Sequence, residues 1–294
     1  MKNPDKVKSV MIILVIYLLT FFLTSALLDY LPAENFFFRI LYADIIATII
    51  IFSFSMVMKN SSVYDPYWSV TPPVIAGYLM FINPGGNPVR QIMVSGIILF
   101  WGIRLTLNWM RGWRGMKHED WRYKGIAART GKYYWLVSFL GIHLVPTLFV
   151  YFGCLPLFYI LPDPSPVSPF EMIALLIATF GILLEWTSDE QLRSFKKRNP
   201  PTAFIKSGAW SLLRHPNYLG EILFWVGIFL FIPLDRIESS FWTCIGFISI
   251  IFLFNLISVP LMDKRNIQSR PGYVNYMKNT PALVPSIKNM FENR

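Results

Sequence analysis

The chain has 294 residues, of which 54% are hydrophobic, 17% aromatic and 15% charged, and its formal net charge is +10. About a quarter of the residues of a typical soluble domain are charged, so this composition excludes an ordinary soluble enzyme and predicts a protein with several membrane spans. The basic balance does not indicate nucleic-acid binding, because Lys and Arg are distributed between apolar runs. Neither cysteine belongs to a CxxC pair, so no metal site is expected.

Apolar runs of about bilayer length predict eight membrane-spanning helices. They cover roughly residues 8–30, 36–58, 68–84, 91–110, 134–161, 167–187, 217–233 and 240–261, and the short third run leaves seven spans as an alternative. The predicted fold is therefore an all-α polytopic bundle in one integral membrane domain, residues 1–294, with residues 1–58 as N-terminal spans. The first run has no clear cleavage site, so no cleavable signal is expected.

Basic residues gather on one side of the predicted membrane. With the N-terminus inside, 23 of the 27 Lys and Arg residues lie in inner segments, and Arg39, Arg90 and Arg236 lie in outer loops. This asymmetry follows the positive-inside rule and predicts that both termini face the cytoplasm. The expected membrane is the inner membrane of a bacterium or the endoplasmic reticulum of a eukaryote.

The inner loop 111–133, RGWRGMKHEDWRYKGIAARTGK, alternates Arg residues with aromatic residues. Arg binds phosphate in a bidentate manner, and aromatic rings stack on bases or on guanidinium groups. The loop is therefore a candidate nucleotide site, with Arg111, Arg114, Trp121, Arg122 and Tyr123 as its candidate contacts. The alternative is an interfacial aromatic belt beside anionic lipid.

A polar stripe marks the inner end of the sixth predicted span. Glu185, Asp189, Arg193 and Lys196 follow at helical spacing and share one face. Glu185 lies deepest, where an unpaired carboxylate is hard to keep without a function, such as accepting a hydrogen bond from a ribose hydroxyl. For Asp189 and Arg193 the alternative is a simple surface ion pair.

The segment 206–227, KSGAWSLLRHPNYLGEILFWVG, concentrates polar groups before an apolar helix. Pro216 suits the first helical position, and the free N–H groups of that helix start favour an anion such as phosphate. Lys206, Arg214, His215 and Tyr218 lie around this start, and Asn217 and Glu221 share a face one turn apart. The alternative is a basic membrane boundary with a solvated Glu.

The C-terminal segment places four further polar or aromatic side chains where the last span emerges: Lys264, Arg265, Tyr273 and Tyr276. No GxGxxG motif follows a predicted strand, so the chain has no Rossmann domain. The candidate nucleotide site is therefore expected among helices.

Several of these blocks together resemble the steroid 5-alpha-reductase-like family, and most of all its bacterial and plant branch. They are SGAWSLLRHPNYLGEILFWVG, SVPLMDKR with PGYVNYMKNTPALVP, NSSVYDPYW (60–68), LFWGIRL (99–105) and HEDWRY (118–123). The resemblance covers about residues 60–285, which would form a reductase-like core. RHPNY alone also occurs in the related sterol C14-reductases and isoprenylcysteine carboxyl methyltransferases.

The resemblance implies an NADPH-dependent reductase of a carbon–carbon double bond conjugated to a ketone. In that family the cofactor enters a helical bundle from the cytosol, and a lipophilic substrate enters from the bilayer. The family's cofactor-holding residues match Asn217, Glu221, Asp189, Arg193, Lys196, Arg111 and Arg114. With them we expect contacts from Arg104, Trp121, Arg122, Tyr123, Glu185, Arg214, His215, Tyr218, Lys264, Arg265 and Tyr273.

Three departures from the animal enzymes concern the substrate more than the reaction. Glu185 stands where they have Asn, Lys264 and Arg265 stand near their His-rich stretch, and their catalytic Gln-Glu pair is absent. The nearest counterpart of that Glu is Asp65.

Reduction of an enone places negative charge on the ketone oxygen, where a hydrogen-bond donor lowers the barrier. We expect Asp65 to be that donor if burial keeps it protonated, with Tyr64 and Tyr67 as phenolic donors beside it and Glu221 placing the nicotinamide. The alternative is that Asp65 merely caps a helix that begins at Pro66.

Two other classes of function stay open. One is a membrane methyltransferase that uses S-adenosylmethionine, because the RHPNY block is shared with such enzymes. The other is a non-enzymatic protein that binds sterol or another lipid. Membrane lipids are expected around the chain, and no obligate protein partner is expected.

Overall fold

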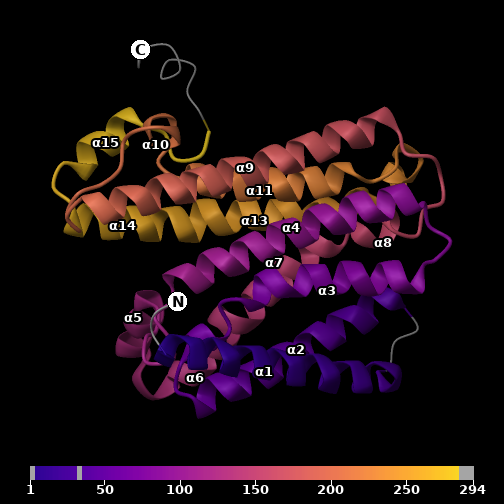
Figure 1. Cartoon of the computed structure of the whole chain (residues 1–294), viewed down its shortest axis with the longest axis horizontal. Coiled ribbons are helices and arrows are strands. Elements are labelled where there is room, and N and C mark those ends of the chain that lie inside the picture. Colours follow the sequence, from indigo (N-terminus) through magenta and orange to yellow (C-terminus); the bar gives the residue numbers. More distant parts are fainter. Residues whose placement is uncertain (1–3, 32–34, 285–294) are drawn as a thin grey trace. The chain divides into compact units, whose positions relative to one another are not determined.

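The computed structural model describes residues 4–31 and 35–284, and all regular secondary structure in these ranges is helical (Figure 1). The α-helices are α1 (Pro4–Leu27), α2 (Phe36–Val57), α3 (Tyr67–Ile82), α4 (Pro88–Gly112), α5 (Trp121–Thr130), α6 (Tyr134–Ser138), α7 (Val145–Cys154), α8 (Leu157–Ile160), α9 (Pro169–Arg198), α10 (Ala209–Leu212), α11 (Pro216–Leu230), α12 (Ile237–Ser240), α13 (Ile245–Phe252), α14 (Val259–Ser269) and α15 (Tyr273–Asn279). Short 3-10 and π-helical turns join several of them. The predicted all-α fold is confirmed.

Within the described residues, six helical stretches are long and apolar enough to cross a membrane: 4–27, 36–57, 88–112, 121–160, 169–198 and 234–269. The other two predicted spans, 68–84 and 217–233, correspond to α3 with 16 residues and α11 with 15 residues. At 1.5 Å per residue such helices reach only about 24 Å, less than the ~30 Å of hydrocarbon. The six long helices indicate a polytopic membrane protein. The count of eight spans stays a prediction, because α3 and α11 are shorter than the membrane is thick.

Local capping explains where the long helices begin. Ser168 accepts a hydrogen bond from the backbone N–H of Glu171, and the Glu171 side chain accepts one from the backbone of Ser168, so α9 begins at Pro169 with a capping box. The helix then continues to Arg198, well beyond the predicted end at residue 187. The polar stripe from Glu185 to Lys196 is thus carried on one regular helix.

The chain divides into two compact units. Unit 1 consists of Met1–Gly86 and Ile98–Pro162, and unit 2 consists of Asn87–Ile97 and Asp163–Arg294. The long helix α4 contributes to both. The prediction of a single domain stays a prediction.

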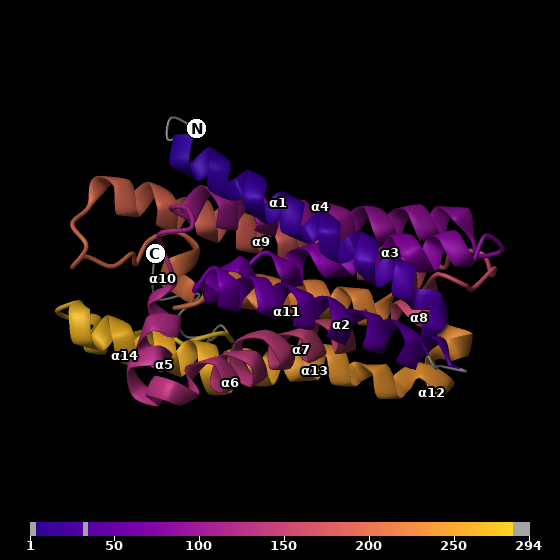
Figure 2. The ribbon, with the colours of Figure 1, turned by 90° about the horizontal axis from the view of Figure 1, so that it is seen from below.

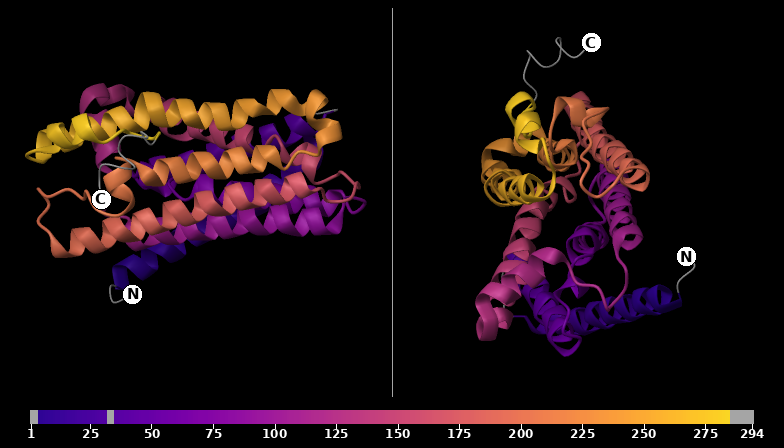
Figure 3. Two further views of the ribbon diagram at one scale, coloured as in Figure 1. Left: turned by 90° about the horizontal axis from the view of Figure 1, so that it is seen from above. Right: turned by 90° about the vertical axis from the view of Figure 1, so that its left-hand side faces the viewer.

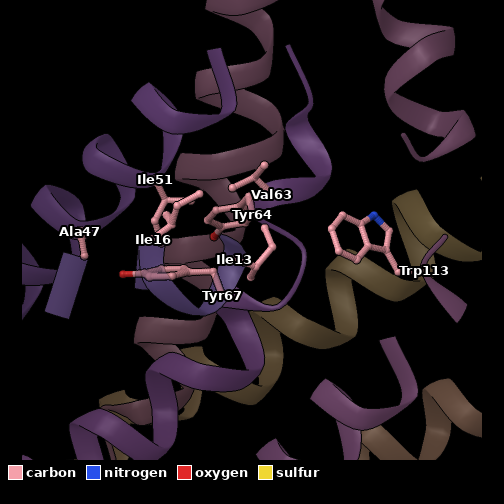
Figure 4. Close-up of a cluster of buried hydrophobic side chains, with 8 residues drawn as sticks. All are labelled: Ile13, Ile16, Ala47, Ile51, Val63, Tyr64, Tyr67 and Trp113. Carbon is pink, nitrogen blue, oxygen red and sulfur yellow. The ribbon is translucent and has the colours of Figure 1, made fainter. Parts of the chain in front are cut away.

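Unit 1 is built from α1, α2 and α3, the second half of α4, and the helices α5 to α8 (Figure 2). Its core is a cluster of buried hydrophobic side chains: Ile13, Ile16, Ala47, Ile51, Val63, Tyr64, Tyr67 and Trp113 (Figure 4). Gly102 allows α4 to approach α3 closely, because a Cβ atom there would lie 2.4 Å from the carbonyl oxygen of Ser69. The start of α3 is thereby held against α4.

Unit 2 is organised by the antiparallel pair α9 and α11, which lie side by side in Figure 3. Their contact is made by small residues: a Cβ on Gly220 would lie 2.6 Å from the Gly181 carbonyl oxygen, and one on Gly227 would lie 2.7 Å from the Ala178 Cβ. Small residues are typical of close helix contacts in membranes. This contact fixes the polar stripe of α9 beside the N-terminal half of α11.

A cluster of buried ion pairs lies at the end of unit 2 where α9 begins. Arg90 is fully buried and makes a bidentate pair with Glu171, with Nε–Oε2 at 2.6 Å and Nη2–Oε1 at 3.0 Å. It also donates to Asp163, which Arg236 contacts from its other side. Burial raises the pKa of the Asp163 carboxyl, but hydrogen bonds from Ser165, and after them Arg236 and Arg90, lower it overall. Arg90 and Arg236, predicted only as outer-loop cations, thus join α4, the loop 161–168 and the start of α9.

Candidate functional site

A cavity of about 90 Å³ lies at the end of unit 2 that was predicted from the sequence to face the cytoplasm. It is lined by polar, aromatic and aliphatic side chains from α9, α10, α11, α14, α15 and their connecting segments: Leu192, Lys196, Phe204, Ile205, Trp210, Arg214, His215, Asn217, Tyr218, Met262, Asn266, Arg270, Tyr273 and Tyr276. Six of the predicted cofactor-binding residues therefore share one cavity: Lys196, Arg214, His215, Asn217, Tyr218 and Tyr273. We call it the inner pocket.

Asp263, on α14, holds together three side chains that form one wall of the inner pocket. Its carboxylate accepts hydrogen bonds from Arg214 Nη2 at 2.9 Å, His215 Nε2 at 3.1 Å and the Tyr273 hydroxyl at 2.7 Å. Each of these donors lines the pocket, and Asp263 itself is buried. Arg214 and His215 were predicted to hold an anion, and the structure gives them this protein carboxylate as a partner instead.

The segment after α14 closes another wall of the inner pocket. The backbone N–H groups of Arg214 and His215 donate to the carbonyl oxygens of Pro281 and Ala282, at 2.9 and 3.1 Å. Arg214 Nη1 donates to the Thr280 carbonyl, and the Tyr276 hydroxyl donates to the Trp210 carbonyl. The C-terminal segment is therefore a structural part of the pocket.

The helix start at Pro216 was predicted correctly, and α11 begins there. The His215 ring stacks on the Tyr218 ring with centroids 5.2 Å apart, and Tyr218 stacks on Phe254 at 4.5 Å. Asn217 Nδ2 lies 3.4 Å from Asp189 Oδ1, so these two predicted residues meet across α9 and α11. Asn217 Oδ1 and Arg214 Nε are buried without a hydrogen-bond partner among the described residues.

Other predicted residues of unit 2 lie beside the pocket lining. Glu185 is buried where α9 meets Gly220, Glu221 accepts a hydrogen bond from Trp225 Nε1 at 2.9 Å, and Arg193 lies 3.6 Å from Glu190. Lys206, Lys264 and Arg265 are exposed.

The inner pocket contains one cation that was not predicted from the sequence. Arg270, which that analysis did not name, lines the pocket together with Lys196. Burial and the neighbouring Arg265 lower the pKa of the Arg270 guanidinium, so these cations repel one another. The sequence signal for Arg270 was its position in QSRPG, between the last span and the C-terminal helix.

The predicted nucleotide loop lies in unit 1, and its side chains are largely engaged there. Arg122 Nε donates to Asp120 Oδ1 at 2.9 Å, and the Tyr123 hydroxyl donates to Asp65 Oδ1 at 2.6 Å. Arg111 and Arg114 are exposed, Trp121 is half-buried, and Arg104 is buried in α4. The structure thus gives Arg122 and Tyr123 protein partners.

Asp65 does not cap α3. The helix begins at Tyr67, the residue before it, Pro66, offers no side-chain cap, and the carboxyl of Asp65 accepts from Tyr123 instead. The alternative that Asp65 merely caps a helix is therefore wrong. Burial raises the pKa of Asp65 to about 6, against the lowering effects of Tyr123 and Arg122.

The three predicted catalytic side chains near residue 65 have different partners. Tyr64 exchanges a hydrogen bond of 2.7 Å with Thr147, which contacts Thr48 at 2.7 Å. Tyr67 does not contact Asp65 by a hydrogen bond: its hydroxyl donates to Asp44 Oδ1, on α2. The Tyr64 and Tyr67 ring centroids are 5.2 Å apart.

Asp44 was not named by the sequence analysis. It is 5% exposed, and its second carboxyl oxygen, Oδ2, has no hydrogen-bond partner among the described residues. A buried carboxyl group in a membrane helix is costly and generally functional. The sequence signal for Asp44 was its position as a single Asp within the apolar run that forms α2. Unit 1 therefore holds a buried Asp44–Tyr67 pair.

Comparison with known proteins identifies the family to which the chain belongs. The sequence profile described as "Protein of unknown function (DUF1295)" matches residues 51–280. The chain belongs to the DUF1295 family. It is also 24% identical, over 263 residues, to a protein of Schizosaccharomyces pombe named "Uncharacterized protein C594.04c", covering 81% of this chain and 76% of the yeast protein. No solved structure gives a match.

The DUF1295 match includes every residue that lines the inner pocket and also Tyr67, but it begins after Asp44 and ends before Pro281. The two groups of residues that carry chemistry are thus the inner pocket of unit 2 and the Asp44–Tyr67 pair of unit 1. The pocket offers cations, aromatic rings and amides, and the pair offers a phenolic hydroxyl beside a carboxyl group.

Proposed function

We propose that this DUF1295 protein is an NADPH-dependent membrane enzyme that reduces a carbon–carbon double bond conjugated to a ketone. Its substrate would be lipophilic and steroid-like, entering from the bilayer. The observation that carries the proposal is the Tyr67 hydroxyl held by the buried carboxyl of Asp44. The resemblance of residues 60–285 to the steroid 5-alpha-reductase-like family supports the same reaction.

Tyr67 is the proposed donor to the substrate ketone. With a protonated Asp44 the contact allows two arrangements, because both the carboxyl and the phenol then carry a hydrogen of their own. In one arrangement Tyr67 donates to Asp44; in the other the Asp44 carboxyl hydrogen is donated to the phenolic oxygen, and the phenol's own hydrogen is free for the ketone oxygen. Hydride added at the β-carbon would then give an enolate whose oxygen Tyr67 stabilises, and a proton taken up from water at the α-carbon would complete the saturated ketone.

Asp65, the donor predicted from sequence, is a weaker candidate for this function. Its carboxyl already accepts a 2.6 Å hydrogen bond from Tyr123 and lies half-buried near the charged residues Asp120 and Arg122. Asp44 has a deeper position and an oxygen without a partner. We therefore assign the carbonyl function to Tyr67 with Asp44 as its positioning residue.

The inner pocket suits the nucleotide. Lys196 and Arg270 supply positive charge for phosphate, Phe204, Tyr273 and Tyr276 supply rings, and Asn217 Oδ1 and Arg214 Nε are a buried acceptor and donor without partners. NADPH, when bound, supplies the hydride. Lys196 and Arg270 favour NADPH, which carries an additional phosphate group, over NADH. We propose that the pocket opens to the cytoplasm, where both termini lie.

The cofactor is tested first, by melting the purified protein in detergent with NADPH, NADH or S-adenosylmethionine. We expect NADPH to raise the melting temperature most, since a ligand that binds the folded state stabilises it. Stabilisation by S-adenosylmethionine alone would identify a methyltransferase, and stabilisation by lipid without any nucleotide would identify a binding protein.

The acid pair is tested next, by measuring NADPH oxidation against a panel of enones. Tyr67→Phe should lower turnover by about 10²–10³ with NADPH affinity nearly unchanged, the size of losing one oxyanion donor. Asp44→Asn should lower it less, since the amide still contacts the phenol. The matched control is Asp65→Asn, which should turn over near the parent rate. Full activity in Tyr67→Phe would remove Tyr67 from the reaction.

A further inference from the structure

The turn that follows α4 in unit 1 packs against the first turns of α1 (Figure 2). Lys6 Nζ donates to the Arg111 carbonyl at 3.3 Å, and the Ser9 hydroxyl accepts a hydrogen bond from the backbone N–H of Met116 at 3.1 Å. Gly115 has a φ of 100°, in the region that favours glycine, and a Cβ atom there would lie 3.0 Å from Ser9 Oγ. Two segments that are distant in the sequence therefore form one surface.

This surface carries an excess of positive charge. Residues 4–9 and 111–117 contain one carboxylate, Asp5, and five cations, so their net charge is +4. Lys117 lies 3.8 Å from Asp5, but both side chains are largely in solvent, so the pair neutralises little of this charge. We call the five cations the basic patch: Lys6, Lys8, Arg111, Arg114 and Lys117. Lys6 is half-buried and the other four are exposed.

The acidic residues that follow the patch in the sequence are engaged elsewhere in unit 1. Glu119 accepts hydrogen bonds from the Ser61 backbone N–H at 2.9 Å and from the Tyr134 hydroxyl at 3.2 Å. Asp120 accepts from Arg122 Nε at 2.9 Å. The positive charge of the basic patch is therefore presented to a molecule outside the protein.

Exposed apolar side chains on the same two helices show how close the patch lies to the hydrocarbon of the membrane. Met11 follows Lys8 on α1 and is 54% exposed, and Leu107 precedes Arg111 on α4 and is 43% exposed. At 1.5 Å per residue, each cation lies only about 4.5–6 Å along its helix from the apolar residue. A partner that contacts both must carry negative charge within several ångströms of hydrocarbon.

We propose that the basic patch binds the headgroups of anionic phospholipids. A phospholipid carries its phosphate directly above its acyl chains, so the headgroup meets the cations while the chains cover Met11 and Leu107. A soluble anion gains nothing from these apolar side chains. Guanidinium groups bind phosphate in a bidentate manner, and clusters of Lys and Arg next to a membrane helix are typical of anionic lipid recognition. The inference goes beyond the proposed reaction and does not depend on it.

The test compares three probes on the full-length protein in detergent, with dissociation constants measured by native mass spectrometry. The probes are phosphatidylglycerol, phosphatidylcholine with the same acyl chains, and glycerophosphoglycerol, which is the first headgroup without acyl chains. The first two differ in headgroup charge at constant hydrocarbon, and the third removes the hydrocarbon at constant charge.

Two patch variants and a matched control separate this surface from the general positive charge of the protein. One patch variant combines Arg111→Gln, Arg114→Gln and Lys117→Gln, and the other combines Lys6→Gln with Lys8→Gln. The control removes three exposed cations of unit 2, by Lys197→Gln, Arg198→Gln and Lys278→Gln. Lys6→Arg with Lys8→Arg keeps the charge on α1.

We expect the parent protein to bind phosphatidylglycerol at least tenfold more tightly than phosphatidylcholine, since each Lys or Arg near an anionic headgroup contributes about fivefold. The preference should fall at least fivefold in both patch variants and persist in the unit 2 control and in the Lys→Arg variant. It should also fall in the parent when the salt concentration rises from about 50 to about 500 mM, because salt screens exposed charges. This salt dependence tests the inference without any substitution, and affinity for phosphatidylcholine reports folding of each variant.

Four results would overturn the inference. They are equal affinities of the parent for the two lipids, an unchanged preference in either patch variant, an equal loss in the unit 2 control, and a loss in the Lys→Arg variant. Glycerophosphoglycerol that binds as tightly as phosphatidylglycerol would assign the patch to a soluble anion, and would overturn it as well.

Discussion

At the residue scale, each unit contains a buried carboxyl group that accepts hydrogen bonds from the side chains around it. Asp44 holds the Tyr67 hydroxyl in unit 1, and Asp263 holds Arg214, His215 and Tyr273 in unit 2. Removing one partner of a buried charged contact leaves the others uncompensated, which is more costly than the contact is worth. The two carboxylates are therefore the most sensitive single positions.

Asp263→Ala is expected to destabilise unit 2 by about 3–5 kcal/mol and to weaken NADPH binding at least tenfold. The physical reason is that Arg214, His215 and Tyr273 lose their common acceptor, and with it the wall of the inner pocket. Gln268→Ala, at an exposed position of α14, is the control and should change neither quantity appreciably. Melting temperature and NADPH titration measure both effects, and a parent-like Asp263→Ala would show that the pocket is held in another way.

Asp65 is expected to make stability depend on pH. Its pKa in the folded protein is about 6, above the ~3.9 of an unfolded chain, so the folded state binds the proton more tightly. Its contribution to stability is complete below about pH 4 and is lost as the pH rises through 6. Asp65→Asn keeps an acceptor for Tyr123, so its melting temperature minus that of the parent should increase between pH 4.5 and 7. A difference that is constant over this range would contradict the burial of the carboxyl.

At the element scale, the packing of α9 on α11 positions the polar stripe beside the pocket. Gly220→Ala places a Cβ within 2.6–2.8 Å of Gly181 and Glu185, so the helices must separate. Overpacking of this kind costs about 1–3 kcal/mol, and the melting temperature should fall by several degrees. Gly77→Ala in α3, where nothing lies within 4 Å, is the control and should leave it equal or higher. A tolerated Gly220→Ala would mean that this contact is not tightly packed.

A structural feature could be predicted from the sequence where the pattern that specifies it lies within a few consecutive residues. Pro216 at the start of α11 and the helical stripe from Glu185 to Lys196 were predictable, because capping and periodicity act over a few residues. The return of residues 280–282 to Arg214 and His215 was not, since no local pattern records a contact between such distant segments. For the same reason Asp263, between more conspicuous cations, was missed.

At the scale of the whole molecule, the positive-inside distribution predicts the orientation in the membrane. Twenty-three of the 27 Lys and Arg residues share one side when both termini are cytoplasmic. Reporter fusions at residues 86, 165 and 236 should therefore read outside, and fusions at either terminus should read inside. A C-terminal reporter found outside together with an N-terminal reporter found inside would exclude an even number of spans, and with it both the predicted eight spans and a six-span arrangement.

Composition predicted the polytopic helical bundle, because apolar content and run length are properties of the whole chain. The number of spans was less predictable, since α3 and α11 are apolar runs that the structure makes only 16 and 15 residues long. The function of Asp44 could have been suspected from its place in an apolar run. Its pairing with Tyr67 required the structure.

The central claim is hydride transfer from NADPH to the β-carbon of a lipophilic enone, and isotope transfer tests it most directly. The purified protein is incubated with an enone and NADPH deuterated at C4 of the nicotinamide, separately in each of the two stereoisomers, and the product is analysed by mass spectrometry and NMR. The account predicts a saturated ketone with one deuterium at the β-carbon from one stereoisomer only, and about 10²–10³ less of it from Tyr67→Phe. Deuterium absent from the product with both stereoisomers, or product formed equally by Tyr67→Phe, would contradict it.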